Sequence, residues 1–163
     1  VVGAAAHCLS GRPGPGPRIE VEPGMEPVWA DHDRLEQVFV NLLENAASHG
    51  ASARGTDVTV RPAAAPGWAE VEVTDYGPGI PAGLTERIFV PRVRGTTEVA
   101  GTGLGLSIAR GIVEAHGGTL TVRPGGPGAS FLVSLPAEPP APAAGPAGAS
   151  WNVVEEPEEI RGG

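Results

Sequence analysis

Two short stretches of the chain combine glycine with residues that could bind a nucleotide. The first, DYGPGIP from Asp75 to Pro81, places a carboxylate directly after a β-branched run and glycines two and four positions later. Such a carboxylate can accept a hydrogen bond from the exocyclic amine of a base, while the glycines let the backbone approach a flat ligand. The same residue types are also typical of a tight turn, and the motif alone leaves both interpretations open.

The second stretch, GTGLGL from Gly101 to Leu106, contains three glycines at alternate positions before an apolar, helix-like run. The free N–H groups and the positive dipole at the start of a helix bind phosphate. The spacing differs from the dinucleotide-binding fingerprint, and the chain has no P-loop pattern and no lysine, which argues against both of those sites. A flexible surface loop is the alternative for the glycines alone.

A third feature is the segment from Asp31 to His49, which has no glycine or proline and shows helical spacing. Its apolar face comprises Leu35, Val38, Phe39, Leu42 and Ala46. The opposite face carries Arg34, Gln37, Asn41, Asn45 and Ser48. Asparagine is a poor helix former, and amide oxygens four residues apart can bind a hard divalent cation together with phosphate oxygens. An ordinary amphipathic helix with a solvated face is the alternative.

Residues 87–100 lie between the two glycine-rich stretches and carry three arginines and two threonines but few residues that pack. A polar segment beside a phosphate site is typical of a nucleotide lid. Because the chain lacks lysine, Arg92 and Arg94 are the cations available to face a γ-phosphate. A solvated loop would have the same composition.

The elements that must position these residues follow from hydrophobic periodicity. We expect strands at residues 19–22, 27–30, 57–61, 68–74, 119–123 and 130–135. We expect helices at residues 31–49, 84–89 and 105–116. The few alternations between strand and helix predict an α+β fold, a two-layer sandwich in which helices cover one face of a mixed sheet.

Composition sets the limits of this domain. Of 163 residues, 25 are glycine and 18 proline, concentrated in part at residues 10–17, a predicted linker, and at residues 136–163, a predicted disordered tail. Residues 18–135 are then the folded domain. A formal net charge of −8 argues against nucleic-acid partners and a polybasic membrane anchor. A single cysteine, Cys8, and short apolar stretches predict a cytoplasmic chain that makes no membrane contact of its own.

Four motifs, in order, resemble those of the catalytic ATP-binding domain of bacterial sensor histidine kinases, within the wider family that includes gyrase, Hsp90 and MutL. DRLEQVFVNLLENAASHG resembles the N box, DYGPGIP the G1 box, ERIFVPRVRG the F box and GTGLGLSIARGIVEAHGG the G2 box. The resemblance implies a two-layer α/β sandwich of the Bergerat type, with ATP and Mg²⁺ as ligands.

The resemblance also implies roles for single residues. Asn41 and Arg94 would lie at the phosphates, and Asn45 would hold Mg²⁺. Asp75 would bind the adenine amine, Phe89 would anchor the lid, and Glu44 beside the stripe is a candidate base. Further nucleotide contacts are implied for His49, Gly77, Gly79, Ile80, Gly101, Thr102, Gly103, Leu104, Gly105 and Leu106.

Three positions qualify the resemblance. Ser48 stands where the family often has lysine, and Arg92 where it usually has a second aromatic residue. Asn41 stands where gyrase-like ATPases and anti-sigma serine kinases have a glutamate that activates water or a hydroxyl. A neutral imidazole needs less activation, so Asn41 favours transfer to histidine.

The expected function is therefore transfer of the γ-phosphoryl group of Mg²⁺–ATP to a histidine on a dimerisation domain absent from this chain, with a response regulator as a further partner. Residues 1–9 would be the end of the dimerisation helices. For His7, no phosphoacceptor context is visible, and His32 and His116 are interpreted as structural or capping residues. The alternatives are a non-catalytic nucleotide-binding or docking remnant and an anti-sigma-type serine kinase.

Overall fold

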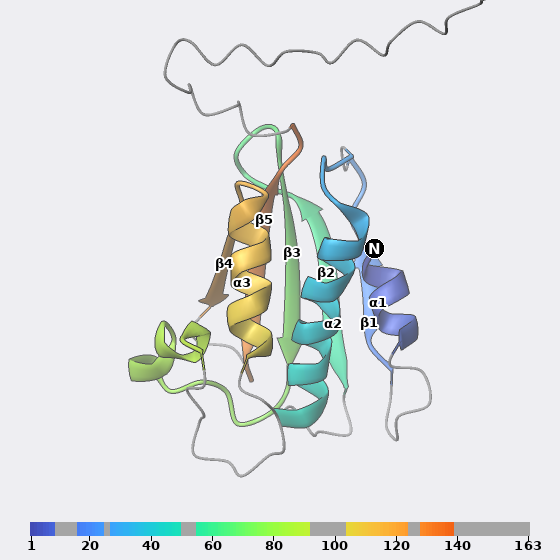
Figure 1. The fold of residues 1–163 in the computed structure, drawn as a ribbon. Coiled ribbons are helices and arrows are strands. Elements are labelled where there is room, and N and C mark those ends of the chain that lie inside the picture. The colour runs from blue at the N-terminus through green and yellow to red at the C-terminus, as the bar shows by residue number, and fades with distance from the viewer. Residues whose placement is uncertain (9–15, 25–26, 50–54, 92–103, 124–127, 139–163) are drawn as a thin grey trace, which may run out of the picture.

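The computed structural model describes residues 1–8, 16–24, 27–49, 55–91, 104–123 and 128–138 (Figure 1). The helices are α1 (Val2–Cys8), α2 (His32–His49) and α3 (Gly105–Ala115). The strands are β1 (Arg18–Val21), β2 (Thr56–Pro62), β3 (Trp68–Asp75), β4 (Thr119–Arg123) and β5 (Ser130–Pro136). Two 3₁₀ turns are η1 (Ala82–Leu84) and η2 (Arg87–Phe89). Most of the predicted linker and tail lies outside the described residues.

The strands form one five-stranded sheet in the order β1-β2-β3-β5-β4. β1 and β2 are parallel, whereas the other neighbouring strands are antiparallel, so the sheet is mixed. The α-helices lie over the same face of this sheet (Figure 1). The α+β fold class and the two-layer arrangement predicted from the sequence are confirmed.

Alternation of side chains along the strands separates the two faces of the sheet. Val71 and Val73 of β3 face the helices, and the antiparallel register places Val133 and Phe131 of β5 beside them. All four side chains are buried. Asp75 continues the same alternation two residues beyond Val73, and it is buried as well. The sheet therefore presents a carboxylate on its helix-facing side, at the end of its central strand.

The long helix α2 forms where the sequence predicts it. Asp31 caps its start, because Oδ1 of Asp31 accepts a hydrogen bond of 3.1 Å from the N–H of Arg34. The buried face consists of Leu35, Val38, Phe39, Leu42, Leu43 and Ala46, which adds only Leu43 to the predicted apolar face.

The end of α3 is tied to the start of α2 by His116. Nδ1 of His116 lies 2.8 Å from the carbonyl oxygen of Ile112, which can only accept, so Nδ1 is the donor. Nε2 then accepts a hydrogen bond of 3.1 Å from the N–H of Asp31. Gly117 follows with a φ of 74°, the conformation that ends many helices. His116 is thus a capping residue.

Two predicted elements are wrong. Residues 27–30 do not form a strand. Trp29 N–H donates one backbone hydrogen bond to Ala137, but Val28 and Ala30 pack against the core instead of extending a ladder. The helix predicted at residues 84–89 is two separate 3₁₀ turns. Pro91 forces Val90 into an extended conformation, with a ψ of 130°, so no regular helix can continue there.

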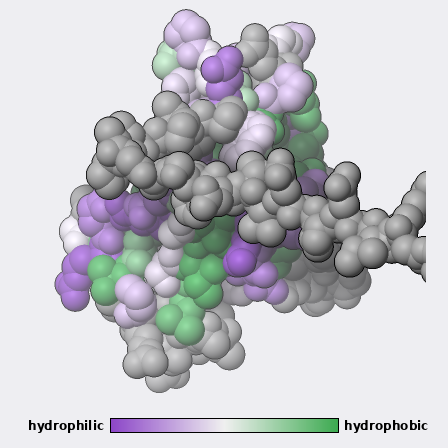
Figure 2. All heavy atoms as spheres, turned by 45° about the horizontal axis from the view of Figure 1, so that its top comes forward, coloured by the Kyte–Doolittle hydropathy of each residue, from purple (hydrophilic) through white to green (hydrophobic). Residues whose placement is uncertain are grey.

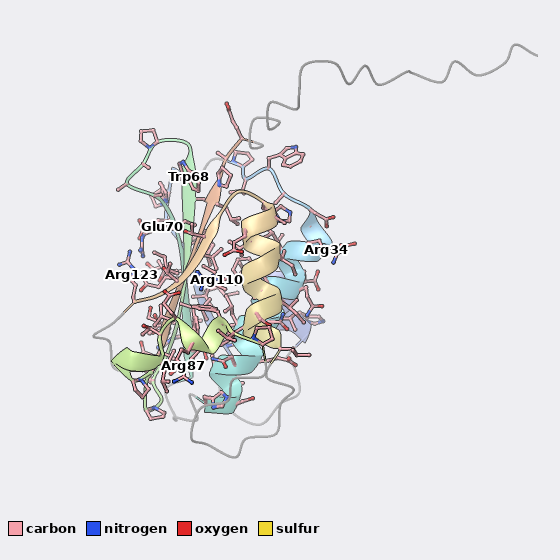
Figure 3. The ribbon with its side chains drawn as sticks, turned by 60° about the vertical axis from the view of Figure 1, so that its left-hand side comes forward. Arg34, Trp68, Glu70, Arg87, Arg110 and Arg123 are labelled. Carbon is pink, nitrogen blue, oxygen red and sulfur yellow. The ribbon has the colours of Figure 1, made fainter. Side chains whose placement is uncertain are left out.

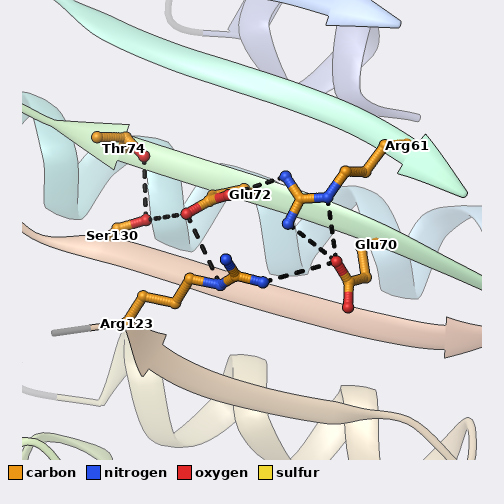
Figure 4. A network of polar contacts seen from close by, with 6 residues as sticks. All are labelled: Arg61, Glu70, Glu72, Thr74, Arg123 and Ser130. Atoms are coloured by element: carbon orange, nitrogen blue, oxygen red, sulfur yellow. Dashed lines mark hydrogen bonds and ion pairs between the residues drawn. The ribbon is translucent and has the colours of Figure 1, made fainter. Parts of the chain in front are cut away.

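The face of the sheet opposite the helices carries a network of charged and hydroxyl groups (Figures 3 and 4). Arg61 donates hydrogen bonds of 2.9 Å to both Glu70 and Glu72, and Arg123 lies 3.8 Å from Glu70. Ser130 Oγ donates to Glu72 at 2.7 Å. Burial alone would raise the pKa of Glu72, but the hydrogen bonds from Ser130 and Arg61 outweigh it and hold that pKa below the ordinary value of 4.5.

Replacing Glu72 with glutamine should change how the protein responds to acid. Because the pKa of Glu72 is lower in the folded chain, its contribution to stability is complete above pH 4.5 and is lost as pH falls through the folded-state pKa. We expect Glu72→Gln to lower the free energy of unfolding by about 1–2 kcal/mol at pH 7. The difference in this free energy between the wild type and the variant should become smaller below pH 4.5. Urea unfolding at several pH values measures this, with the exposed Glu20→Gln as control. A gap independent of pH would contradict it.

Candidate functional site

Three elements place their functional residues at one end of the molecule. In Figure 1 the C-terminal end of β3, the C-terminal half of α2 and the first turn of α3 meet at the bottom of the view. A Cβ added to Gly105, at the start of α3, would lie 3.5 Å from Oδ1 of Asn41 on α2. The fold therefore brings together the first glycine-rich stretch, the amide stripe and the end of the second glycine-rich stretch.

Asp75 is the most deeply buried acidic residue among those that the structure describes, with 3% of its surface exposed. Its Oδ1 accepts hydrogen bonds from the backbone N–H groups of Gly77, at 2.9 Å, and Ala129, at 3.1 Å. Within the described residues, its hydrogen bonds all go to Oδ1. A buried carboxylate is costly unless it is hydrogen-bonded. Oδ2 is therefore the atom that can accept a hydrogen bond from a ligand.

The turn after Asp75 requires glycine at Gly79. Its φ is 75°, in the left-handed region, and an added Cβ would lie 3.2 Å from the carbonyl oxygen of Gly128. Gly77 uses its N–H to hold the Asp75 carboxylate. Ile80 follows and packs, half-buried, against the core. The turn thus combines exposed backbone with an apolar side chain beside the carboxylate.

Two site residues, Gly128 and Ala129, are not predicted from the sequence, because they lie between the predicted strands at residues 119–123 and 130–135. Besides donating to Oδ1, Ala129 accepts a backbone hydrogen bond of 2.9 Å from Asp75 N–H. A Cβ added to Gly128 would lie only 2.2 Å from the Asp75 carbonyl oxygen. The available signal was the pairing of two predicted strands: once β3 and β5 are antiparallel, Thr74 lies opposite Ser130.

The amide stripe on α2 holds an unsatisfied donor. Nδ2 of Asn41 is buried and has no hydrogen-bond partner in the described residues, whereas its Oδ1 accepts a bond of 3.2 Å from Gln37. Buried polar atoms are rarely left unpaired. Asn45 and Glu44, on the same half of the helix, are half-buried, while His49 is exposed at the helix end. A ligand with acceptor oxygens beside Asn41 would satisfy its amide.

The start of α3 carries no side-chain cap from its N-cap residue. Leu104, at the N-cap position, makes no side-chain capping bond. Ser107 Oγ donates to the Leu104 carbonyl oxygen, at 2.8 Å, so this hydroxyl does not cap the first N–H groups of the helix. Gly105 adds no side chain in front of them, and Leu106 packs half-buried against the core. An uncapped helix start of this kind is a site for phosphate or carboxylate.

Phe89 anchors the η2 turn in the core. Its buried ring lies edge-on to Phe131, with 6.4 Å between the ring centroids and an interplanar angle of 82°. The Arg110 guanidinium of α3 lies over the Phe89 ring, 4.8 Å from its centroid. Arg110 also forms ion pairs of 3.0 Å with Glu86 and Glu114, and the hydrogen bond to Glu86 raises its pKa. Arg110, labelled in Figure 3, is a contact that sequence reasoning missed.

Several predicted site residues lie outside the described residues. They are Arg92, Arg94, Gly101, Thr102 and Gly103. The predicted lid cation and most of the second glycine-rich stretch therefore stay predictions.

Two cavities near the helices of the described residues are not lined by Asp75. One, of about 330 Å³, lies beneath α1 and is mostly apolar. The other, of about 570 Å³, runs between the start of α2 and the outer side of α3, where Trp29 and Ile108 are 59% and 47% exposed. In Figure 2, which brings the top of Figure 1 toward the viewer, hydrophobic and hydrophilic side chains lie next to each other. The buried Asp75 carboxylate, the start of α3 and the unpaired Asn41 amide indicate a ligand site more specifically than the volume of either cavity does.

Comparison with known proteins agrees with this geometry. Residues 30–139 match the family model described as "Histidine kinase-, DNA gyrase B-, and HSP90-like ATPase". The chain belongs to this ATPase family. The match spans all the described site residues, from Asn41 on α2 to Ala129 beside Asp75. The chain therefore contains an ATP-binding domain homologous to those of sensor histidine kinases.

Individual members of this ATPase family are similar over most of the chain. "Two-component sensor PprA" of Pseudomonas aeruginosa is 43% identical over 118 residues, which cover 69% of this chain and 13% of PprA. The mycobacterial sensor histidine kinase MprB superposes with a TM-score of 0.63 at 35% identity, covering 76% of this chain and 85% of the MprB chain. The nucleotide-free catalytic domain of histidine kinase ThkA gives 0.62 at 33% identity, with 74% and 78% covered.

The chain thus spans only a small part of the full-length curated relatives that it matches.

Within the described residues, no group of three or more histidine, cysteine, aspartate or glutamate side chains could hold a metal ion. In the same part of the chain, every helix is too short or too polar to cross a membrane.

Proposed function

We propose that this domain binds Mg²⁺–ATP and transfers the γ-phosphoryl group to a histidine of a dimerisation domain outside the chain, in two-component signal transduction. The observation that carries the proposal is the Asp75 carboxylate. It is buried, its Oδ1 is held by two backbone donors, and Oδ2 stays open at the end where an uncapped helix begins.

Asp75 is the acceptor for the adenine amine. A hydrogen bond from an exocyclic amine to a buried carboxylate oxygen is stronger than the same bond in water, because solvent does not compete for it. Gly77 and Gly79 leave the backbone open to the flat base, and Ile80 supplies apolar contact. This arrangement favours adenine over a base that carries a carbonyl oxygen at the same position.

The phosphates then lie toward α3. The N–H groups that follow Leu104 and Gly105 bind their oxygens, and the Asn41 amide supplies a further donor. The remaining phosphate contacts of the proposal come from Gly101, Thr102, Gly103 and Arg94, with Phe89 anchoring the lid and His49 at the rim. Support for Phe89 comes from its burial against Phe131.

Asn45 is the proposed Mg²⁺ ligand. Magnesium in nucleotide sites is held by one or two protein oxygens together with phosphate oxygens and waters, and not by a protein cage. The half-buried amide of Asn45 on the stripe fits such a donor set. The ion would neutralise charge on the transferring phosphoryl group.

Transfer breaks the bond between the γ-phosphorus and the ADP oxygen and forms a bond to a ring nitrogen of the acceptor histidine. A neutral imidazole attacks with its own lone pair, so Asn41, which cannot remove a proton, suits this acceptor. Glu44 is the candidate base for the proton that the phosphorylated ring releases. The chain's own residues mainly bind and orient the nucleotide.

The proposal includes a place in a longer protein. Residues 18–135 form the catalytic domain, residues 10–17 the linker and residues 1–9 the end of the dimerisation helices. That helix end is supported by α1, whose Ala5 is fully buried. Residues 136–163 are the acidic tail. The kinase acts in the cytoplasm on a response regulator, through the phosphorylated histidine.

ATP titration tests the proposal. We expect calorimetry to detect ATP binding that strengthens when Mg²⁺ is present and weakens at least about tenfold for inosine triphosphate, whose base has an oxygen in place of the amine. A separately produced acceptor domain should then take up label from the γ-phosphate in an acid-labile form. Binding without transfer would favour a nucleotide-binding or docking remnant, acid-stable label a serine kinase, and no binding at millimolar ATP would contradict the proposal.

A further inference from the structure

The residue that follows Asp75 turns to the opposite face of the sheet. Asp75 faces the helices, while Tyr76 continues the outer face beyond Thr74, because side chains alternate along a strand. The Tyr76 hydroxyl donates a hydrogen bond to Oδ2 of Asp57 on β2. One short stretch of backbone thus carries the base-binding carboxylate on one side and a tyrosine anchor on the other.

Asp57 also holds the edge strand. Arg18 is the first residue of β1 and pairs with Asp57 in the parallel register. Its Nε donates to Oδ1 of Asp57 at 2.7 Å, and its Nη2 lies 2.6 Å from the same oxygen. The hydrogen bond to Asp57 raises the pKa of Arg18, so this cation keeps its charge. The two oxygens of one carboxylate therefore join β1 to the segment that bears Asp75.

Tyr76 is the last anchored side chain before the turn. Beyond it the chain continues through Gly77, Pro78 and Gly79, and the Gly77 N–H is itself one of the two donors that hold Asp75. Glycine restricts backbone rotation least of all residues. If Tyr76 were released, the peptide between Asp75 and Gly77 could rotate and carry the carboxylate with it.

We propose that Tyr76 and Asp57 are positioning residues that set the direction of the Asp75 carboxylate, and that Arg18 extends this control to strand β1. The inference rests on the proposed contact between Asp75 and the adenine amine. Through it, strand β1 is linked to nucleotide affinity by way of Asp57 and Tyr76. Arg18, Asp57 and Tyr76 are called the outer relay below.

Tyr76→Phe tests the outer relay, because it removes one hydroxyl and keeps the ring. We expect the affinity for ATP to fall about tenfold, the value of one charge-assisted hydrogen bond, while the affinity for inosine triphosphate changes less than about twofold. The preference for ATP over inosine triphosphate should therefore fall about tenfold. A substitution that only lowered the stability of the fold would reduce the affinities for ATP and for inosine triphosphate by the same factor.

Arg61→Gln is the matched control. Arg61 lies on the same outer face and is bound to two carboxylates, but it pairs with Glu70 far from Asp75 along β3. Arg61→Gln should lower the stability of the protein and leave its preference for ATP over inosine triphosphate unchanged. Arg18→Gln should lower the preference in the same direction as Tyr76→Phe. The double variant should show less than the sum of the two effects, because both break one relay.

The outcomes separate the two levels of the proposal. A wild-type protein that binds ATP and inosine triphosphate equally overturns the role of Asp75, and the outer relay with it. A wild-type protein that prefers ATP, together with a Tyr76→Phe variant that keeps the full preference, overturns the relay alone. Equal weakening of both nucleotides by Tyr76→Phe would also overturn it, since that result assigns Tyr76 a purely structural role.

Discussion

Asp75→Asn should abolish most ATP binding and reverse the nucleotide preference. Asparagine has the same shape, and its amide oxygen can still accept the hydrogen bonds that Gly77 and Ala129 donate to Oδ1. The amide nitrogen then occupies the place of Oδ2 and faces the adenine amine, donor against donor. We expect ATP affinity to fall roughly a hundredfold, about 2.7 kcal/mol.

The same substitution should improve the relative binding of inosine triphosphate. An amide nitrogen at that position can donate to the carbonyl oxygen of the 6-oxo base, which a carboxylate repels. Calorimetric titration of both nucleotides measures the change, and circular dichroism confirms that the variant is folded. If Asp75→Asn retained the affinity for ATP, the base would have to bind elsewhere.

Among substitutions of glycine by alanine at the described residues that border the site, Gly128→Ala should cause the largest loss of stability. The Cβ of alanine at this position would lie 2.2 Å from the carbonyl oxygen of Asp75 and 2.6 Å from Oδ1 of Asp75. Asp75 is held by two hydrogen bonds to Ala129, one from its N–H and one to its Oδ1, so it cannot move away without separating β3 from the segment that leads into β5. We expect a loss of about 3 kcal/mol in the free energy of unfolding, together with the loss of ATP binding.

Gly111→Ala is the matched control for this prediction. Gly111 lies on the exposed side of α3, and nothing lies within 4 Å of an added Cβ. Because alanine is the better helix former, that variant should gain up to about 1 kcal/mol. Urea unfolding of both variants makes the comparison. Equal stability of Gly128→Ala and the wild type would mean that the segment at Gly128 is not packed against Asp75.

The parts of the site that the sequence predicts are those whose chemistry is local. Asp75 and its glycines are adjacent in the chain, and the α2 stripe follows from one helical period with a cap at Asp31. The hairpin of β2 and β3 is equally local. In each case neighbouring residues determine the conformation, so a short window of sequence contains the information.

The missed parts depend on contacts between distant segments. Ala129 reaches Asp75 only because β3 and β5 pair in one register out of several, and Arg110 reaches Phe89 only because α3 packs over η2. The two wrong elements fail for a related reason. Residues 27–30 show strand-like alternation, but Trp29 finds one backbone partner rather than a ladder. Tertiary context overrides propensity in such short segments.

The bond between His116 and Asp31 gives the helix layer a fixed end and a free end. The imidazole fastens the last turn of α3 to the first turn of α2. At the other end the Asn41 side chain lies beside the start of α3, and its buried amide nitrogen has no hydrogen-bond partner among the described residues. His116 therefore fixes the relative position of the two helices at the end of the layer that is distant from the site. A ligand that accepts a hydrogen bond from the Asn41 amide would add a second link between the two helices, at the end of the layer opposite to His116.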